Sequence, residues 1–145
     1  MTKKLKTRKE CPDGYSFSIC IDGSKKSLDA LQLLCKMKST KDKIHVIICE
    51  QPNVDTKKIK DTVSFHLEEG GHLSVSNICV LKSNPGQKTK DIIRDHLIGE
   101  GSEDVDMVVV GNKGADYSSR DSKDYIGSVA SEVLRHTKLN CLFIM

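Results

Sequence analysis

The sequence predicts an α/β fold: a three-layer sandwich with a five-stranded, mostly parallel sheet and helices on both faces. Three observations support this fold class. Strand-like and helix-like periods alternate along the whole chain. The strand-like runs are nearly continuous in valine and isoleucine, which is typical of strands covered on both faces. Helical segments separate consecutive strands, and such crossovers require parallel strands with right-handed connections.

Five short apolar runs have the length and composition of strands. They are rich in β-branched residues, and several end at turn signals such as Asp22-Gly23 and Gly111. The expected strands are Tyr15–Asp22, Lys43–Glu50, Leu73–Leu81, Asp106–Val110 and Asn140–Met145.

Four segments between these runs place apolar residues at helical spacing. In the second segment Ile59, Val63 and Leu67 are four residues apart, and the pattern stops at Gly70-Gly71, a typical helix end. The expected helices are Ser24–Met37, Asp55–Glu69, Gln87–Ile98 and Ile126–His136.

Length and composition exclude several classes of protein. The chain has 145 residues, about one domain. Its longest uninterrupted apolar run is Cys141–Met145, which excludes a membrane span, and no apolar segment follows the basic N-terminus as a secretory signal would require. Aromatic residues make up 4% and tryptophan is absent, which argues against base-stacking nucleic-acid modules. We therefore expect neither a membrane nor a specific nucleic acid as partner.

The net charge of +3 comes from the N-terminus. Five basic residues lie within the first nine, so residues 10–145 carry 18 − 20 = −2. We interpret residues 1–12 as a basic disordered leader and residues 13–145 as the domain. The alternative is an arm that binds nucleic acid or a membrane surface.

The cysteines and histidines show no familiar reactive or metal-binding spacing. The six cysteines lie mainly in apolar runs and form no CxxC pair, which is typical of buried, reduced thiols in a cytoplasmic protein. The five histidines are scattered and form no HxxxH or HExxH, so the sequence predicts no metal ligands. GxxxxGK[ST], GxGxxG and GxSxG are also absent, and no catalytic residue is predicted.

Ligands of an open parallel sheet bind at the carboxyl ends of its strands, where the strand order reverses. Asp22-Gly23-Ser24 follows the first expected strand, and Gly111-Asn112-Lys113-Gly114 follows the fourth. Glycines there let a phosphate approach the backbone, and a helix that begins at Gly127-Ser128-Val129 offers unpaired N–H groups to an anion. Taken singly, these are a capped turn, a tight exit from a strand and an ordinary helix start. Together they suit the phosphates of a nucleotide, with Asp22 able to hydrogen-bond a ribose or base.

These residues resemble the universal stress protein family over about Tyr15 to Met145. The family's hallmark after the fourth strand is Gly-x2-Gly-x9-Gly-[Ser/Thr], and this chain has Gly111-x2-Gly114-x12-Gly127-Ser128, a loop three residues longer. Asp22 at the end of the first strand and Asn84-Pro85-Gly86 before the third helix also match. Ala130 departs from the pattern, because ATP-binding members often carry a hydroxyl residue there.

The resemblance implies the strand order 3-2-1-4-5 and an adenine-nucleotide site between the first and fourth strands. It implies that Asp22 contacts the adenosine part and that Ile48 lines the adenine pocket, and Ile21 beside Asp22 is assigned to the same nucleotide-binding site. The expected ligand is ATP with Mg²⁺ bridging its phosphates, and the expected partner is a second copy of the chain, paired through the last strand as a homodimer. The residues implied to wrap the ribose and phosphates are Val110, Gly111, Lys113, Gly114, Gly127, Ser128 and Val129.

The site residues and the family resemblance leave three hypotheses for the function. The favoured one is a universal stress protein-like, ATP-binding regulatory domain of the stress response. The second is a nucleotide-independent dimerisation or interaction module of the same fold. The third is an adenine-nucleotide hydrolase-type enzyme with at most slow ATP hydrolysis. For that enzyme the loop from Asp22 to Ser27 has only one glycine, and the sequence names no general base or nucleophile.

Overall fold

A computed structural model describes residues 4–99, 105–111 and 128–144 of the chain. Within these residues five strands form one sheet in which all neighbouring strands are parallel, in the order β3-β2-β1-β4-β5. The predicted topology is therefore confirmed. The strands are β1 (Ser16–Ile21), β2 (Lys43–Cys49), β3 (Ser76–Leu81), β4 (Met107–Gly111) and β5 (Asn140–Ile144).

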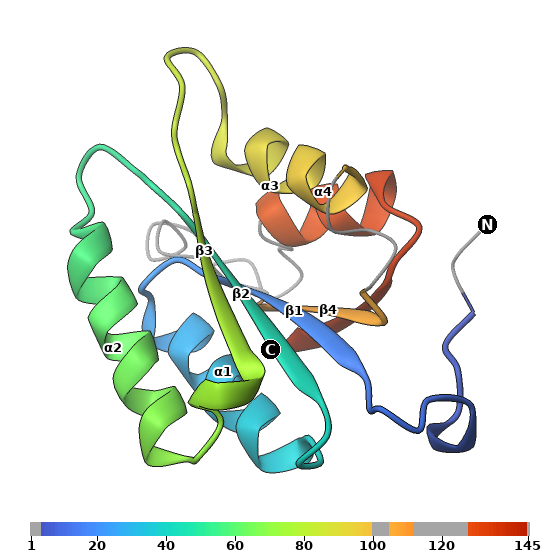
Figure 1. Ribbon diagram of the computed structural model, residues 1–145. Coiled ribbons are helices and arrows are strands. Elements are labelled where there is room, and N and C mark those ends of the chain that lie inside the picture. The colour runs from blue at the N-terminus through green and yellow to red at the C-terminus, as the bar shows by residue number, and fades with distance from the viewer. Residues whose placement is uncertain (1–3, 100–104, 112–127, 145) are drawn as a thin grey trace.

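Helices cover both faces of this sheet (Figure 1). On one face lie α1 (Lys25–Met37) and α2 (Thr56–Glu69); on the other lie α3 (Thr89–Ile98) and α4 (Ser128–His136). The predicted three-layer sandwich is thus confirmed. Among the described helices none is long and apolar enough to cross a membrane.

The predicted strand Leu73–Leu81 is wrong for its first three residues. Leu73–Val75 form a short 3-10 helix, η2, and β3 begins only at Ser76. The Ser76 hydroxyl donates to the carbonyl of His72 at 2.5 Å, and the Ser76 N–H donates to the carbonyl of Leu73. Because these are local hydrogen bonds to the backbone, the apolar pattern of the segment does not reveal them.

Alternate residues of each inner strand pack into two separate cores. Phe17, Ile19 and Ile21 of β1 face α1 and α2, whereas Cys20 faces α3 and α4. Ile19 of β1, in the core under α1 and α2, and Val108 of β4, in the core under α3 and α4, have no exposed surface. Since complete burial of such a side chain stabilises a fold by about 1.5–3 kcal/mol, both layers of helices hold the two central strands in place.

All six cysteines are free thiols. Cys20 and Cys49 are buried and the other four are half-buried. Burial raises the pKa of Cys20 to about 12, so this thiol is protonated at neutral pH and packs as a small apolar group. The predicted role of the cysteines inside the apolar runs is confirmed for these two.

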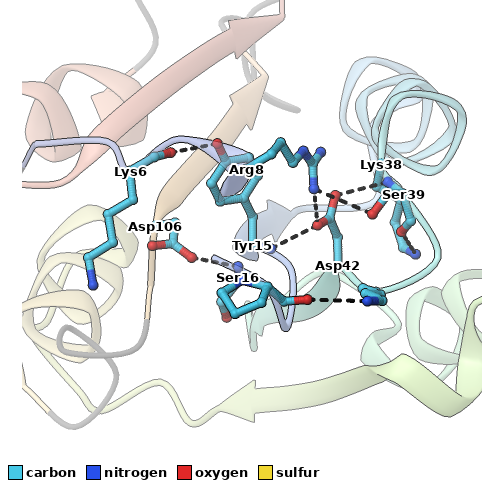
Figure 2. A network of polar contacts seen from close by, with 10 residues as sticks. Lys6, Arg8, Tyr15, Ser16, Lys38, Ser39, Asp42 and Asp106 are labelled. Atoms are coloured by element: carbon cyan, nitrogen blue, oxygen red, sulfur yellow. Dashed lines mark hydrogen bonds and ion pairs between the residues drawn. The ribbon is translucent and has the colours of Figure 1, made fainter. Parts of the chain in front are cut away.

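Two carboxylates close the amino-terminal edge of the sheet (Figure 2). The Asp42 side chain has no exposed surface and accepts hydrogen bonds from the N–H of Tyr15 at 2.8 Å, the N–H of Ser39 at 2.9 Å and the Arg8 guanidinium. Asp106 accepts a hydrogen bond from the N–H of Ser16 at 2.8 Å. The residues just before β2 and just before β4 are therefore both hydrogen-bonded to the backbone at the start of β1.

Part of the N-terminal segment lies against this edge. Residues Arg8–Glu10 form a 3-10 helix, η1, that Thr7 caps. The Tyr15 hydroxyl donates to the Lys6 carbonyl at 2.5 Å, and the Arg8 guanidinium carbon lies 4.3 Å from the centre of the Tyr15 ring (Figure 2). These contacts join residues 6–8 to the domain. The assignment of residues 1–12 to a disordered leader stays a prediction.

We predict that Asp42→Asn destabilises the protein and weakens its response to acid. Burial raises the pKa of Asp42, but the hydrogen bonds from Arg8 and from the N–H groups of Tyr15 and Ser39 outweigh burial and hold this pKa below its ordinary value. Such a carboxylate stabilises the fold fully above its unfolded pKa, about 3.9, and this contribution is lost as pH falls through the lower folded pKa. We expect a loss of about 1.5–3 kcal/mol in the free energy of unfolding at neutral pH.

Urea titrations of the wild type and the variant, from neutral pH into the acid range, measure this loss. The difference between the two proteins should shrink as pH falls below the unfolded pKa of aspartate. The control is Asp13→Asn, which changes an exposed carboxylate near the same edge. If Asp42→Asn and Asp13→Asn unfold alike at neutral pH, the stabilising role of Asp42 is wrong.

Candidate functional site

The strand order reverses between β1 and β4, and there the two strands stop pairing early. The β1–β2 ladder extends to Ile21–Ile48, and the β4–β5 ladder extends to Gly111–Ile144. Between β1 and β4, however, the last pair is Ile19–Val109. The last two residues of each strand are therefore unpaired with one another, and the carboxyl ends of β1 and β4 separate at the place where open α/β sheets bind ligands.

The turn after β1 places Asp22 at this edge. Asp22 is half-buried, and its Oδ1 accepts a hydrogen bond from the N–H of Ser24 at 2.9 Å. Ser24 in turn caps α1, because its hydroxyl accepts from the N–H of Ser27 at 3.2 Å. The first turn of α1 contains no acidic residue. The positive end of the α1 dipole thus lies beside the Asp22 carboxylate, and the first turn itself adds no further carboxylate.

Lys26 in the first turn of α1 lies against the end of β4. A methyl group added to Gly111 would lie 3.4 Å from Cγ of Lys26 and 3.8 Å from its backbone carbonyl carbon. The segment that follows β1 therefore contacts the end of β4 at Lys26 and Gly111. This contact places a cationic side chain at the carboxyl edge of the sheet. Lys26 is not among the site residues predicted from the sequence. Its position four residues after Asp22, in the first turn of a predicted helix, was the available signal.

The apolar residues assigned to the site are buried in the cores. Ile21 and Ile48 pack into the core under α1 and α2, and Val110 packs into the core under α3 and α4. Their exposed fractions are 2%, 0% and 3%. A ligand at this edge would therefore meet the backbone of these residues rather than their side chains.

Only part of the glycine-rich motif lies in the described residues. Gly111 ends β4, and α4 begins at Ser128 with Val129 half-buried behind it. Lys113, Gly114 and Gly127, which the sequence assigns to the phosphates, lie outside the described residues.

Ala130 belongs to the core. It is 1% exposed and packs with Ile93, Leu97 and Val133 under α3 and α4. The alanine that departs from the family pattern therefore has a packing role in this chain.

An ion-pair cluster on Glu132 holds α4 against α3. An oxygen of the Glu132 carboxylate lies 2.5 Å from Nη1 of Arg94, and the same carboxylate lies 3.8 Å from Nζ of Lys90 and 3.9 Å from Nε2 of His136. Burial raises the pKa of Glu132, but the Arg94 hydrogen bond and the charges of His136 and Lys90 outweigh burial and lower it. Glu132 is therefore ionised at neutral pH and helps to fix α4, whose first residues belong to the candidate site.

Known proteins share this fold. No protein-family model and no curated protein sequence matches the chain. A universal stress protein solved in complex with cAMP is similar over 91% of this chain and 97% of its own, with a TM-score of 0.65 and 19% identity. A universal stress protein from Archaeoglobus fulgidus matches over 90% and 93%, with a TM-score of 0.65 and 15% identity. A Mycobacterium tuberculosis H37Rv protein matches over 91% and 95%, with a TM-score of 0.53 and 19% identity.

These likenesses define the class of fold as an open, parallel α/β sandwich with a strand-order reversal between β1 and β4. Within that class, the chain has the fold of the universal stress proteins, as the resemblance in sequence predicted.

We predict that the fold tolerates alanine at Gly111 but not at Gly14. At Gly111 the added methyl group makes only ordinary contact with Lys26, so Gly111→Ala should change the free energy of unfolding by about 0.5 kcal/mol or less. Gly14 has φ +88°, and a methyl group there would overlap the backbone of Lys41. Left-handed backbone alone costs about 1–2 kcal/mol for a residue with a side chain, and the overlap adds to this cost.

Thermal and urea unfolding of the two variants measure the difference. Gly86→Ala is the matched control, because Gly86 has φ +82° and open space around it. We expect the order of destabilisation to be Gly14→Ala, then Gly86→Ala, then Gly111→Ala. A strongly destabilised Gly111→Ala would show that the fold itself requires this glycine.

Proposed function

We propose that this chain binds an adenine nucleotide, ATP with Mg²⁺ in particular, between the carboxyl ends of β1 and β4, and acts as a nucleotide-responsive regulatory domain. The observation that carries the proposal is the early end of the β1–β4 ladder at Ile19–Val109. It separates two strand ends at the point of strand-order reversal, between an acidic residue on one side and a glycine on the other.

The chemistry of this edge fits a nucleoside phosphate. Asp22 supplies a carboxylate at this edge, and carboxylate oxygens accept hydrogen bonds of the kind that ribose hydroxyls donate. The N-terminus of α1, Lys26 and the bare backbone of Gly111 suit the phosphates. The sequence adds Lys113, Gly114, Gly127 and the start of α4 at Ser128 to the phosphate side. Mg²⁺ would bridge the phosphates, and we assign it no protein ligand.

A solved neighbour supports the class of ligand. One of the universal stress proteins with this fold, which matches over 91% of this chain at 19% identity, was solved in complex with cAMP, an adenine nucleotide. We extend adenine-nucleotide binding to this chain on the combined basis of fold, Asp22 and the glycine motif. The free thiols fit a reducing compartment, so we also propose that the protein is cytoplasmic.

We predict that ATP with Mg²⁺ raises the melting temperature of the purified chain. A ligand that binds only the folded state stabilises it by about 2.7 kcal/mol at one hundred times its dissociation constant. Differential scanning fluorimetry with ATP, ADP, AMP, cAMP and no nucleotide measures the shift and ranks the ligands. If no nucleotide shifts the transition, nucleotide binding is wrong and the alternative of a nucleotide-independent interaction module is favoured.

Two lysine variants locate the phosphates. Lys26→Met keeps the aliphatic stem beside Gly111 and removes the charge. If Lys26 donates one charge-assisted hydrogen bond, about 1.5 kcal/mol, ATP binding weakens roughly tenfold. The control is Lys25→Met, because Lys25 is exposed and pairs with Asp29 at 3.0 Å. Equal ATP affinities of the Lys26→Met and Lys25→Met variants in calorimetry would exclude Lys26 from the site.

Gly127→Val should abolish ATP binding, as the sequence motif predicts.

We also propose that the chain forms a homodimer through β5. This strand is an edge of the sheet, and Leu142, Phe143 and Ile144 on it are half-buried. An edge strand presents unpaired backbone groups that a second copy can satisfy. We predict that light scattering at micromolar concentration gives twice the 16.1 kDa mass of one chain. A single-chain mass at every concentration tested would contradict the dimer.

A further inference from the structure

Two histidines and a cysteine that are far apart in the sequence meet on the α3 side of the sheet. His45 lies on β2, Cys79 on the edge strand β3, and His96 on α3. Their side-chain ligand atoms, the imidazole nitrogens and the thiol sulfur, all lie within 4.8 Å of one another. All three residues are half-buried, so the cluster is neither sealed in the core nor spread over the open surface.

The topology explains why these residues converge. Ile47 and Cys49 of β2 pack under α3 and α4, so His45, two residues before Ile47, faces the same side. Cys79 is the register partner of Ile47 in the neighbouring parallel strand, which places it on this face as well. On α3, His96 lies between the buried residues Ile93 and Leu97, and this helix packs over β2.

The distance between the two histidines matches that of ligands on one metal ion. Their Nε2 atoms are 3.4 Å apart, and the rings are stacked at 18° with centroids 5.7 Å apart. Two nitrogens each about 2.0–2.1 Å from a tetrahedral zinc ion are about 3.3–3.4 Å apart, and a nitrogen and a sulfur are about 3.6 Å apart. The Cys79 sulfur would therefore have to approach the nitrogens by roughly 1.2 Å at most, within reach of a side-chain rotation.

We propose that His45, Cys79 and His96 form a binding site for Zn²⁺, with a fourth coordination position left for water or another ligand. Two imidazoles and a thiolate are donors that borderline-soft divalent ions such as Zn²⁺ select, whereas Mg²⁺ and Ca²⁺ require oxygen ligands. Three protein ligands with an open position distinguish this site from a closed structural zinc site. The bound ion would join the edge strand β3 to α3.

The protonation of His45 is compatible with metal binding. Burial and the proximity of His96 lower the pKa of His45, so His45 is neutral at neutral pH and has a lone pair available. The same two rings could instead share an N–H···N hydrogen bond, which needs no metal and makes no use of the thiol. The two arrangements differ in whether Cys79 takes part, and this difference is what an experiment can measure.

The test is a titration of the full chain, treated with a chelator and kept reduced, with Co²⁺ as a spectroscopic substitute for Zn²⁺. We expect one Co²⁺ per chain, the visible absorption of a tetrahedral ion, a thiolate-to-metal charge-transfer band, and displacement of Co²⁺ by Zn²⁺. Zn²⁺ should also raise the melting temperature, since it binds the folded state. An octahedral spectrum, or no stoichiometric binding, would overturn the proposal.

Four variants assign the ligands. Cys79→Ser should remove the charge-transfer band, and His96→Gln should weaken Zn²⁺ binding by more than the roughly 10–100-fold that loss of an outer-shell partner costs. The matched controls are Cys141→Ser, another half-buried free thiol, and His66→Gln, a histidine on α2. Both controls should bind Zn²⁺ like the wild type. If Cys79→Ser fails to fold by circular dichroism, His96→Gln decides, and unchanged affinity in that variant would show that the site is not metal-binding.

Discussion

The arrangement of this domain depends on the opposite directions in which the chain leaves β1 and β4. From β1 it passes through α1 on one face of the sheet and returns as β2; between β4 and β5 lies α4, on the other face. The segments that follow these two strands lie on opposite faces, and the ladder between the strands stops at Ile19–Val109. The separation lies at the strand-order reversal, the place where open α/β sheets bind ligands, whatever side chains line it.

The amino-terminal and carboxyl-terminal ends of the strands therefore differ in the contacts that their side chains make. At the amino edge, Asp42 and Asp106 take up backbone N–H groups at the start of β1, and Arg8 adds a guanidinium to the Asp42 carboxylate. At the carboxyl edge the turn is held by Asp22 and Ser24, next to the N-terminus of α1. The amino edge is thus fixed by carboxylates that accept backbone N–H groups, and the carboxyl edge carries the backbone and charged groups of the proposed nucleotide site.

Much of the fold could be predicted from the sequence because its periodicities are strong. Residues such as Ile19 and Val109 mark strands covered on both faces, and Ile59, Val63 and Leu67 mark the inner side of α2. The start of β3 could not be predicted, because a hydroxyl of Ser76 bonded to the local backbone leaves no trace in an apolar pattern. For the candidate site, Asp22 and Gly111 were visible as residues that follow strands.

Other parts of the sites depend on contacts between distant segments. Lys26 was missed because its place beside Gly111 follows from how α1 crosses the end of β4. His45, Cys79 and His96 were missed because no spacing along one element relates them. Two neighbouring strands and a helix across them bring those three together, and only the register of β2 with β3 reveals it.

The position of Arg8 separates the basic N-terminal segment from the carboxyl edge of the sheet, where we propose that a nucleotide binds. Arg8 contacts Asp42 and the Tyr15 ring, and the Lys6 carbonyl accepts a hydrogen bond from Tyr15, the residue just before β1. The six residues of β1 extend about 20 Å from there at about 3.3 Å per residue. Electrostatic interactions at physiological ionic strength decay over about 8 Å. The cationic residues at that end would therefore be screened from the phosphates of a nucleotide bound at the far end, as we propose. An anionic surface or molecule could occupy one end of the domain without competing for the other.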